Sequence, residues 1–329
     1  MQDFKKLFES FSSLKVGVIG DVMLDTYILG QVERISPEAP VPVVSLQKKE
    51  YRIGGAANVA LNCKSLGAQV AVLSVIGDDA EAILLEELLE TERLDNSWLV
   101  KSLARITTSK TRIISRNQQM MRLDSEITND LSKEDESALL QNIQAYITTV
   151  DPDIIIFEDY NKGVLTEKLI AETIALCKAA GVITAADPKL KNFFSYKHTD
   201  IFKPNLKEVR ESLHMLIDKP SMSVLKTIHT ELENILHHQI SFITLSEHGV
   251  FYQLNGDARL IPSHLRSVAD VSGAGDTVIA VASMVYAATK NARLMAELAN
   301  IAGGLVCEEV GTVSINKEKL LHECEILLS

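Results

Sequence analysis

Residues 270–290 read Asp270-Val-Ser-Gly-Ala-Gly-Asp276 followed by TVIAVASMVYAATK, a turn of small residues that leads into an apolar helix. Glycines let the backbone approach a ligand closely, and the free N–H groups at a helix start hold an anion. Asp276 lies at that start, where a carboxylate can accept a proton from a substrate hydroxyl. The alternative is that Ser272 or Asp276 only caps the helix. The stretch therefore indicates either a phosphate site with a base or a capped turn.

The chain before this stretch alternates short apolar runs with longer amphipathic runs, which predicts βα units in a parallel sheet. The first strand is predicted at 16–19, a helix at 57–66 and a second strand at 70–76. Asp78 and Asp79 then precede AEAILLEELLE with acids suited to the positive end of a helix. The alternation continues through DIIIFED, VITAADP, DIFKPN and ISFITLS, whose continuous apolar runs are typical of a sheet covered on both faces.

Two stretches break this alternation. Residues 27–47 are rich in Val, Ile and Pro, and residues 106–123 alternate β-branched residues with Arg, Ser and Gln. Both patterns are typical of strands. Pro37, Pro40 and Pro42 favour loop or edge positions over a central strand. We expect the two stretches to form a small separate sheet that projects from the main domain as a lid.

Composition limits the class of protein. Apolar residues make up 46% of the 329 and charged residues 23%, as in ordinary globular proteins. A net charge of -11 repels polyanions, so nucleic acid is not an expected partner, whereas a few converging cations can still hold a small anion. No stretch reaches the roughly 18 apolar residues of a membrane span, and no secretory signal opens the chain. The four cysteines form no CxxC pair, and we expect free thiols in the cytoplasm.

Two polar motifs lie near the first predicted strand. Gly54-Gly-Ala-Ala-Asn58 opens a predicted helix, and the Asn58 amide offers a donor and an acceptor to a polyol. The alternative is a loop whose small residues serve helix packing. Gly20-Asp21-Val-Met-Leu-Asp25 follows the first strand, where ligands of open α/β sheets gather. One carboxylate there can bind two sugar hydroxyls, or it caps a turn.

Two further motifs follow later strands. Lys203-Pro-Asn205-Leu-Lys-Glu208 places an Asn and a Glu on one side of a first helical turn, and oxygen ligands suit Mg²⁺. The same spacing also predicts a capping box. Thr244-Leu-Ser246-Glu247-His-Gly249 indicates either a nucleotide loop or a simple turn. The motifs GxxxxGK[ST], GxGxxG and GxSxG are absent, and the histidines lack metal-ligand spacing.

In their order along the chain, GGAANVA, NLKE, TLSEHG and DVSGAGD resemble the motifs of the ribokinase-like, or pfkB, carbohydrate kinases. The segments GDVMLDTY, RISPEAPVPVV, SRNQQMMRLD, EDYNKG and DPK are similar to the branch of that family that phosphorylates D-glycero-β-D-manno-heptose 7-phosphate. The resemblance implies one domain over residues 1–329, with a doubly wound, mainly parallel α/β sheet and a small β lid. It also implies ATP and Mg²⁺ as cofactors, a homodimer, and transfer to the anomeric hydroxyl for ADP-heptose and surface polysaccharide.

The resemblance assigns roles to residues of the quoted motifs. Those of phosphoryl transfer are the base Asp276 and an anion hole of Gly273, Ala274 and Gly275. Those that contact the sugar are Asp25, Gly54, Gly55, Asn58 and Asp159. Those that hold the nucleotide, besides Gly273 and Gly275, are Asn205, Glu208, Ser246, Glu247, Gly249 and Asn300. Glu208 would hold Mg²⁺ through water, and Asp270 and Ser272, with the 307–311 loop, a monovalent cation such as K⁺.

A phosphate on the sugar needs cationic partners. We expect them among Arg112, Arg116, Arg122, Lys162 and Lys189.

Two features depart from the family pattern. Bifunctional members continue into a nucleotidyltransferase domain, and because this chain stops before one, the second activity is not expected. Leu245 stands where a more polar residue is usual, which leaves that nucleotide contact open. The alternatives are a kinase for ribose, fructose or fructose 1-phosphate, and a non-catalytic sensor on the same fold, against which the intact Asp276 argues.

Overall fold

An eight-stranded sheet forms the centre of the molecule in the computed structural model, which describes residues 3–116, 118–217, 219–264 and 266–328. Its order is β14-β13-β12-β11-β10-β9-β1-β4. Strands β4 to β12 in this order run parallel, whereas β13 is antiparallel to β12 and β14 is antiparallel to β13. The strands are β1 (Lys15–Gly20), β4 (Gln69–Leu73), β9 (Ile154–Glu158), β10 (Ile183–Asp187), β11 (Ile201–Phe202), β12 (Ile240–Thr244), β13 (Val250–Leu254) and β14 (Asp257–Ile261).

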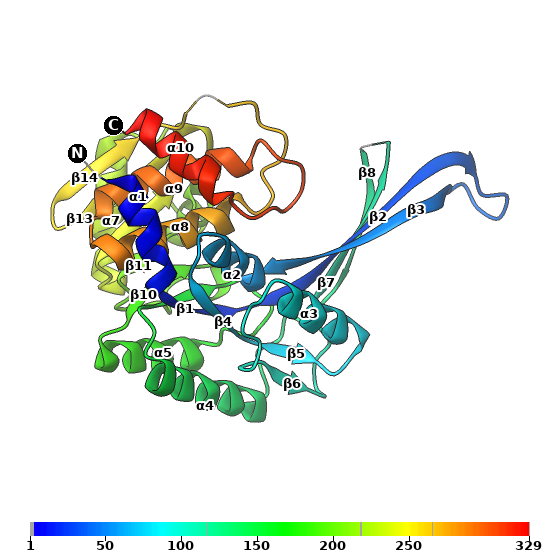
Figure 1. Ribbon diagram of the computed structural model, residues 1–329, viewed down its shortest axis with the longest axis horizontal. Coiled ribbons are helices and arrows are strands. Elements are labelled where there is room, and N and C mark those ends of the chain that lie inside the picture. Colours follow the sequence, from blue (N-terminus) through cyan, green and yellow to red (C-terminus); the bar gives the residue numbers. More distant parts are fainter. Residues whose placement is uncertain (1–2, 117, 218, 265, 329) are drawn as a thin grey trace.

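Helices cover both faces of this sheet, which confirms the doubly wound α/β fold (Figure 1). In β9, Ile154 and Ile156 point to one apolar core while Ile155 and Phe157 point to the other, and all four are fully buried. The first core is packed by α1 (Phe4–Ser10), α2 (Ala56–Ser65), α3 (Ala80–Thr91), α8 (Ala274–Thr289), α9 (Ala292–Val306) and α10 (Lys317–Leu327). The second is packed by α4 (Lys133–Val150), α5 (Glu167–Ala180), α6 (Leu206–Leu213) and α7 (Met222–Leu236).

The predicted strand over 70–76 is interrupted. Ser74 separates β4 from β5 (Val75–Gly77), which pairs instead with β6 (Val100–Ser102). The buried Ser74 hydroxyl donates to the carbonyl oxygen of Gly20, 2.6 Å away. This polar contact ties the end of β1 to the break between β4 and β5.

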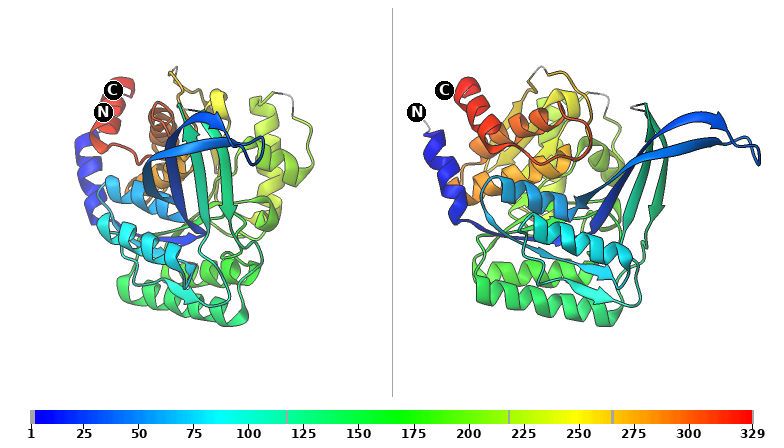
Figure 2. Two further views of the ribbon diagram at one scale, coloured as in Figure 1. Left: turned by 90° about the vertical axis from the view of Figure 1, so that its right-hand side faces the viewer. Right: turned by 45° about the vertical axis from the view of Figure 1, so that its right-hand side comes forward.

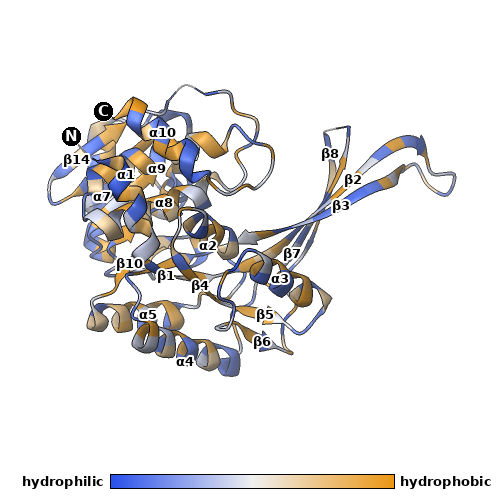
Figure 3. Ribbon diagram, viewed as in Figure 1, coloured by the Kyte–Doolittle hydropathy of each residue, from blue (hydrophilic) through white to orange (hydrophobic). Residues whose placement is uncertain are grey.

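A four-stranded lid projects from the body, and α1 and α10 lie together on the opposite side (Figures 1 and 2). Its order is β3-β2-β7-β8, built from β2 (Val22–Ile35), β3 (Pro42–Gly55), β7 (Ser109–Ser115) and β8 (Gln118–Ser125). Pro42 opens the edge strand β3, as its missing N–H requires. Figure 3 shows that the lid mixes hydrophilic and hydrophobic residues, whereas the central strands are apolar.

The separate sheet is confirmed, but its first part spans 22–55 instead of the predicted 27–47, and its second part spans 109–125 instead of 106–123. Strand β2 begins and strand β3 ends inside the main domain, where Val22 pairs with Gly55. Residues Val22–Leu24 are buried there, so their apolar pattern resembles that of a core strand. The root of the lid therefore lacks the mixed polar and apolar pattern from which the rest of the lid was predicted.

Candidate active site

A pocket of about 460 Å³ opens where the carboxyl ends of β9 and β10 meet the start of α8. Ligands of open α/β sheets bind at this edge. The pocket brings together several of the predicted site residues with polar groups that the motifs did not mark. Its lining is Glu158, Tyr160, Asp187, Lys189, Lys203, Asn205, Leu206, Lys207, Thr244, Ser246, Val271, Gly273, Gly275 and Asp276.

Asp276 occupies the first turn of α8 and is 4% exposed. The helix begins after Gly273, whose φ of 78° is the left-handed conformation that glycine adopts readily. One carboxylate oxygen, Oδ2, accepts from Asn58 Nδ2 at 2.7 Å, and Oδ1 accepts from the Tyr160 hydroxyl at 2.7 Å. Burial raises the pKa of Asp276 to about 6, against the lowering effect of both donors. A base with such a pKa is matched to work near neutral pH.

Asn58 reaches Asp276 because α2 begins at a glycine turn. Gly55 has φ 60° and ψ −137°, and a Cβ there would collide with the carbonyl oxygen of Asp21. The predicted helix start at this motif is confirmed, and Asn58 lies in the first turn of α2. In this structure the Asn58 amide therefore donates a hydrogen bond to Asp276. The contact of Asn58 with a sugar stays a prediction.

The two acids after β1 have different surroundings. Asp21 is buried and accepts from the backbone N–H groups of Tyr160, Lys162 and Val164, at 2.8 to 3.0 Å. It thus holds the loop after β9 in place, as a capping residue would. Asp25 lies on β2 and accepts from Arg112 Nη1 at 2.5 Å.

Gly54 lies beside Asp25 in the lid. A Cβ at Gly54 would collide with Asp25 Oδ2. The close fit between the glycine and this carboxylate explains why no larger residue stands there.

Asn205 and Glu208 form the capping box that their spacing allowed. Asn205 Oδ1 accepts from the Glu208 N–H at 2.9 Å, and Glu208 Oε2 accepts from the Asn205 N–H at 2.8 Å. The other oxygen, Oε1, lies 3.0 Å from Lys189 Nζ. Glu208 therefore caps α6 and also takes part in the charged cluster of the pocket.

Asp187 is the centre of that cluster. Its carboxylate lies 3.1 Å from Lys189 Nζ and 2.6 Å from Lys203 Nζ, and the Lys203 side chain is only 3% exposed. Burial opposes ionisation of Asp187, but the two lysines outweigh it and lower its pKa. Two ammonium groups are thereby held beside the start of α8, where they add positive potential.

Glu158 also lines the pocket, and neither of its carboxyl oxygens has a hydrogen-bond partner among the described residues. Its burial, reinforced by Asp187 and Asp276, raises its pKa well above the ordinary value. Motif reading missed Glu158, Tyr160, Asp187 and Lys203. A usable signal existed for two of them, because Glu158 and Asp187 each end an apolar strand at the carboxyl edge.

The five predicted phosphate-binding cations have different partners, and which of them holds a phosphate stays a prediction. Lys189 belongs to the Asp187 cluster, and Arg112 pairs with Asp25 on the lid. Arg122 makes a two-bond pair with Asp124, at 2.8 and 2.9 Å. The other two are Lys162, 2.7 Å from Glu126, and Arg116, exposed just beyond the end of β7 with φ 51°.

Asp159 lies outside the pocket lining. One oxygen accepts from the Asn161 N–H at 2.7 Å and the other from the buried Tyr196 hydroxyl at 2.8 Å. Burial raises its pKa to about 6. Both oxygens are thus used within the protein, and the predicted sugar contact stays untested.

The remaining predicted nucleotide residues come from the segment after β12 and from α9. Ser246 lines it, whereas the Glu247 side chain is 78% exposed and lies outside the lining. A Cβ at Gly249 would collide with the Ile261 carbonyl oxygen, and Asn300 Nδ2 donates to the Pro262 carbonyl oxygen at 2.8 Å. Leu245 is buried in the second core, which accounts for an apolar residue at that position.

The residues predicted to hold a monovalent cation lie together. Asp270 Oδ1 accepts from the N–H and hydroxyl of Ser272, at 2.9 and 2.8 Å, and Oδ2 accepts from the Gly311 N–H at 3.0 Å. Within the described ranges, no group of three or more His, Cys, Asp and Glu is arranged to hold a metal. In the same ranges, no helix has the length and apolar character that crossing a bilayer requires.

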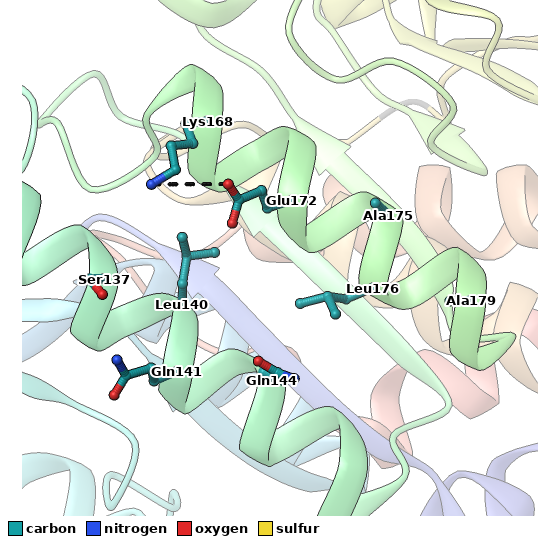
Figure 4. Close-up of a pocket in the computed structure, with 9 residues that line it drawn as sticks. All are labelled: Ser137, Leu140, Gln141, Gln144, Lys168, Glu172, Ala175, Leu176 and Ala179. Atoms are coloured by element: carbon teal, nitrogen blue, oxygen red, sulfur yellow. Dashed lines mark ion pairs between the residues drawn. The ribbon is translucent and has the colours of Figure 1, made fainter.

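A second pocket of about 460 Å³ lies between α4 and α5 (Figure 4). Leu140, Leu176 and glutamine side chains line much of it, and its only ion pair joins Lys168 to Glu172 at 4.0 Å among the residues drawn. It shares no lining residue with the pocket at α8. No constellation of acid, base and anion-binding groups forms there, so we assign the chemistry to the pocket at α8.

Comparisons with known proteins agree with this arrangement. Residues 13–319 match the family model described as pfkB family carbohydrate kinase. The bifunctional protein HldE of Methylobacillus flagellatus is 42% identical over 94% of this chain and 62% of its own length. The chain spans less than two thirds of the length of the curated relatives it matches.

Two solved structures have a similar fold. Phosphofructokinase-2 from Escherichia coli in complex with potassium superposes with a TM-score of 0.78 at 15% identity, over 95% of this chain and 99% of that one. Arabidopsis thaliana ribokinase complexed with ribose and ATP gives a TM-score of 0.71 at 16% identity, over 94% and 98%. The ribokinase-like fold with its small lid is therefore confirmed.

Proposed function

The chain belongs to the pfkB family of carbohydrate kinases, and on that premise we propose that it phosphorylates the anomeric hydroxyl of D-glycero-β-D-manno-heptose 7-phosphate with ATP. An ATP-dependent sugar kinase is what the family and the fold establish. The observation that carries the proposed reaction is the buried carboxylate of Asp276 at the start of α8, beside two paired lysines. The choice of heptose rests on the HldE relatives and on the segments RISPEAPVPVV and SRNQQMMRLD.

The chemistry follows from the positions of the groups. The acceptor hydroxyl lies against Asp276, which takes its proton as the oxygen attacks the γ-phosphoryl group. The backbone N–H groups at Gly273–Gly275 and the ammonium groups of Lys189 and Lys203 stabilise the transferred negative charge. The new ester is the 1,7-bisphosphate, and ADP leaves.

Mg²⁺ bound with ATP would neutralise phosphate charge at this site. Oxygen ligands suit it. The carboxyl group of Glu158 has both oxygens free of partners among the described residues and faces the pocket, so it fits the ion. Both oxygens of Glu208 are engaged, by the Asn205 N–H and Lys189, which favours contact through water.

We also propose that the protein forms a homodimer through its lid. Large hydrophobic side chains are exposed there, with Ile35, Leu46, Met121 and Leu123 each more than half exposed. The edge strands β3 and β8 present unpaired backbone groups, which proteins usually cover. The four free cysteines are consistent with a reducing compartment, and we place the reaction in the cytoplasm, where ATP is available.

The test is ATP consumption with a panel of acceptors: heptose 7-phosphate, unphosphorylated heptose, ribose, fructose and fructose 1-phosphate. We expect kcat/KM for heptose 7-phosphate to exceed that for the unphosphorylated sugars by on the order of 100-fold, since charged hydrogen bonds to the phosphate of the acceptor contribute about 1.5–3 kcal/mol. Asp276→Asn serves as the control for contaminating kinases. Comparable turnover of an unphosphorylated sugar would contradict the proposed substrate. Binding of ATP without turnover of any acceptor would instead favour a sensor.

A further inference from the structure

The inner face of the lid carries a row of alternating charges. Cross-strand neighbours on one face of a sheet point the same way, and the pairing aligns Arg52, Asp25, Lys110 and Asp124 across β3, β2, β7 and β8. This face is turned toward the body, because Arg52 Nη1 donates to the Thr312 carbonyl oxygen at 3.2 Å. Lys110 Nζ lies 5.3 Å from the centre of the Tyr160 ring.

Lys110 differs from the other cations of this face. Arg52 pairs with Glu50, Arg112 with Asp25 and Arg122 with Asp124. In the part of the chain that the structure describes, Lys110 makes no ion pair. Its side chain is half-buried, and this burial lowers its pKa despite the opposing field of Asp25. A half-buried ammonium that rests on an aromatic ring but makes no ion pair remains costly in free energy. An anion bound there would remove that cost.

The position of Lys110 relative to the base indicates which anion. The Tyr160 ring lies between them, since Lys110 rests against the ring and the Tyr160 hydroxyl donates to Asp276 at 2.7 Å. An acceptor sugar whose reacting hydroxyl meets Asp276 therefore extends along Tyr160 toward Lys110. The transferred phosphoryl group has its own cations, Lys189 and Lys203.

We propose that Lys110 binds the phosphate that the acceptor sugar already carries, and so selects phosphorylated acceptors. This inference deepens the proposed function and rests on it for the identity of the sugar. Lys110 is not among the five cations expected from the sequence, and no motif marked it. Lys162, whose positive charge also acts on Lys110, increases the attraction for a dianion at this place.

The experiment compares Lys110→Met with Lys49→Met on heptose 7-phosphate and on unphosphorylated heptose. Lys49 is a matched control, because it lies 4.9 Å from the centre of the Tyr51 ring on the same lid, but on its outer face. For Lys110→Met we expect kcat/KM for heptose 7-phosphate to fall about 10- to 100-fold, the range of one charged hydrogen bond. The loss should lie mainly in the KM for the sugar phosphate. The constants for unphosphorylated heptose and the KM for ATP should change less than about 3-fold, and Lys49→Met should behave as wild type.

Several results would overturn the inference. An equal loss with both acceptors would place Lys110 in phosphoryl transfer or in folding, and an unchanged heptose 7-phosphate KM would remove it from the site. Lys110→Arg keeps the charge and should retain most of the preference, and Lys110→Gln replaces Lys110→Met if that variant does not fold. If the wild type instead prefers another phosphorylated sugar, the heptose assignment fails and the same comparison is made on that sugar. A wild type that does not discriminate by phosphate refutes the role of Lys110.

Discussion

Replacing Asp276 by Asn should make the enzyme slower and also more stable. The pKa of this carboxyl group lies near 6 in the folded protein against 3.8 in the unfolded chain, chiefly because of burial. A folded-state pKa above the unfolded value means that folding favours the protonated form. The folded protein therefore loses stability as the pH rises from about 4 to 6 and carries the full cost of the buried charge above that.

The size of the effect follows from the two pKa values. Each pH unit between them corresponds to about 1.4 kcal/mol, so the cost at pH 7.5 is about 3 kcal/mol. Asn removes the charge, but it offers only one acceptor oxygen to the two donors Asn58 and Tyr160. A mismatched donor costs about 1–2 kcal/mol. The net gain in the free energy of unfolding should be about 1–2 kcal/mol, while kcat falls about 10²- to 10⁴-fold because the proton acceptor is gone.

Urea denaturation of both proteins between pH 5 and 7.5, with ATP turnover at pH 7.5, tests this reasoning. The stability difference should narrow as the pH falls, because the wild-type carboxylate becomes protonated. The KM for ATP should change little. Near-normal kcat with unaltered circular dichroism would make Asp276 a cap rather than a base. A difference in stability that does not depend on pH would show that the buried charge is not its cause.

Three other outcomes are expected. Tyr160→Phe removes one hydrogen-bond donor from Asp276, so the acid limb in the pH profile of kcat/KM, at about pH 6 in wild type, should move upward by about 1 pH unit. An acid limb that does not move would show that Tyr160 does not control the pKa of the base. Gly55→Ala should lower the free energy of unfolding in urea by more than about 2 kcal/mol, because of the positive φ and the collision with Asp21. Gly181→Ala, with φ 74° and open space around the added Cβ, should lower it by about 1 kcal/mol. Equal losses would contradict the role of the collision. Leu123→Glu should shift the mass measured by light scattering toward the monomer, and a wild type that is already monomeric at micromolar concentration would refute the lid dimer.

Sequence patterns predicted the local structure well where one force dominates. The short apolar run of β9 is typical of a strand covered on both faces, and the glycine turns before α2 and α8 follow from backbone sterics. The capping box of Asn205 is equally local. These features depend on residues within a few positions of one another, which is why they can be seen without the fold.

Contacts between distant segments of the chain were harder to predict from the sequence. Nothing in the order of residues joins Tyr160 to Asp276, or Asp187 to Lys203, because these pairs form only when separate strands end at one edge. Which of the predicted phosphate-binding cations holds a phosphate could not be predicted for the same reason: the sequence shows the type of each charge but not its partner. Lys110 stands out only because its neighbours on the lid are paired with acids.

The lid and the base are connected by one continuous stretch of chain. Strand β3 runs to Gly55 and passes directly into α2, which carries Asn58 to Asp276. One added residue in β3 between Lys48, which pairs with Leu29 at the bulge, and Gly55 would exchange the inner and outer faces of the strand, and would carry the sugar side away from the site. Added residues in the hairpin tip, at 36–41, leave that pairing intact. During evolution or in a chimera, the reach of the lid can therefore vary only beyond the bulge, while its root is inherited together with the catalytic centre.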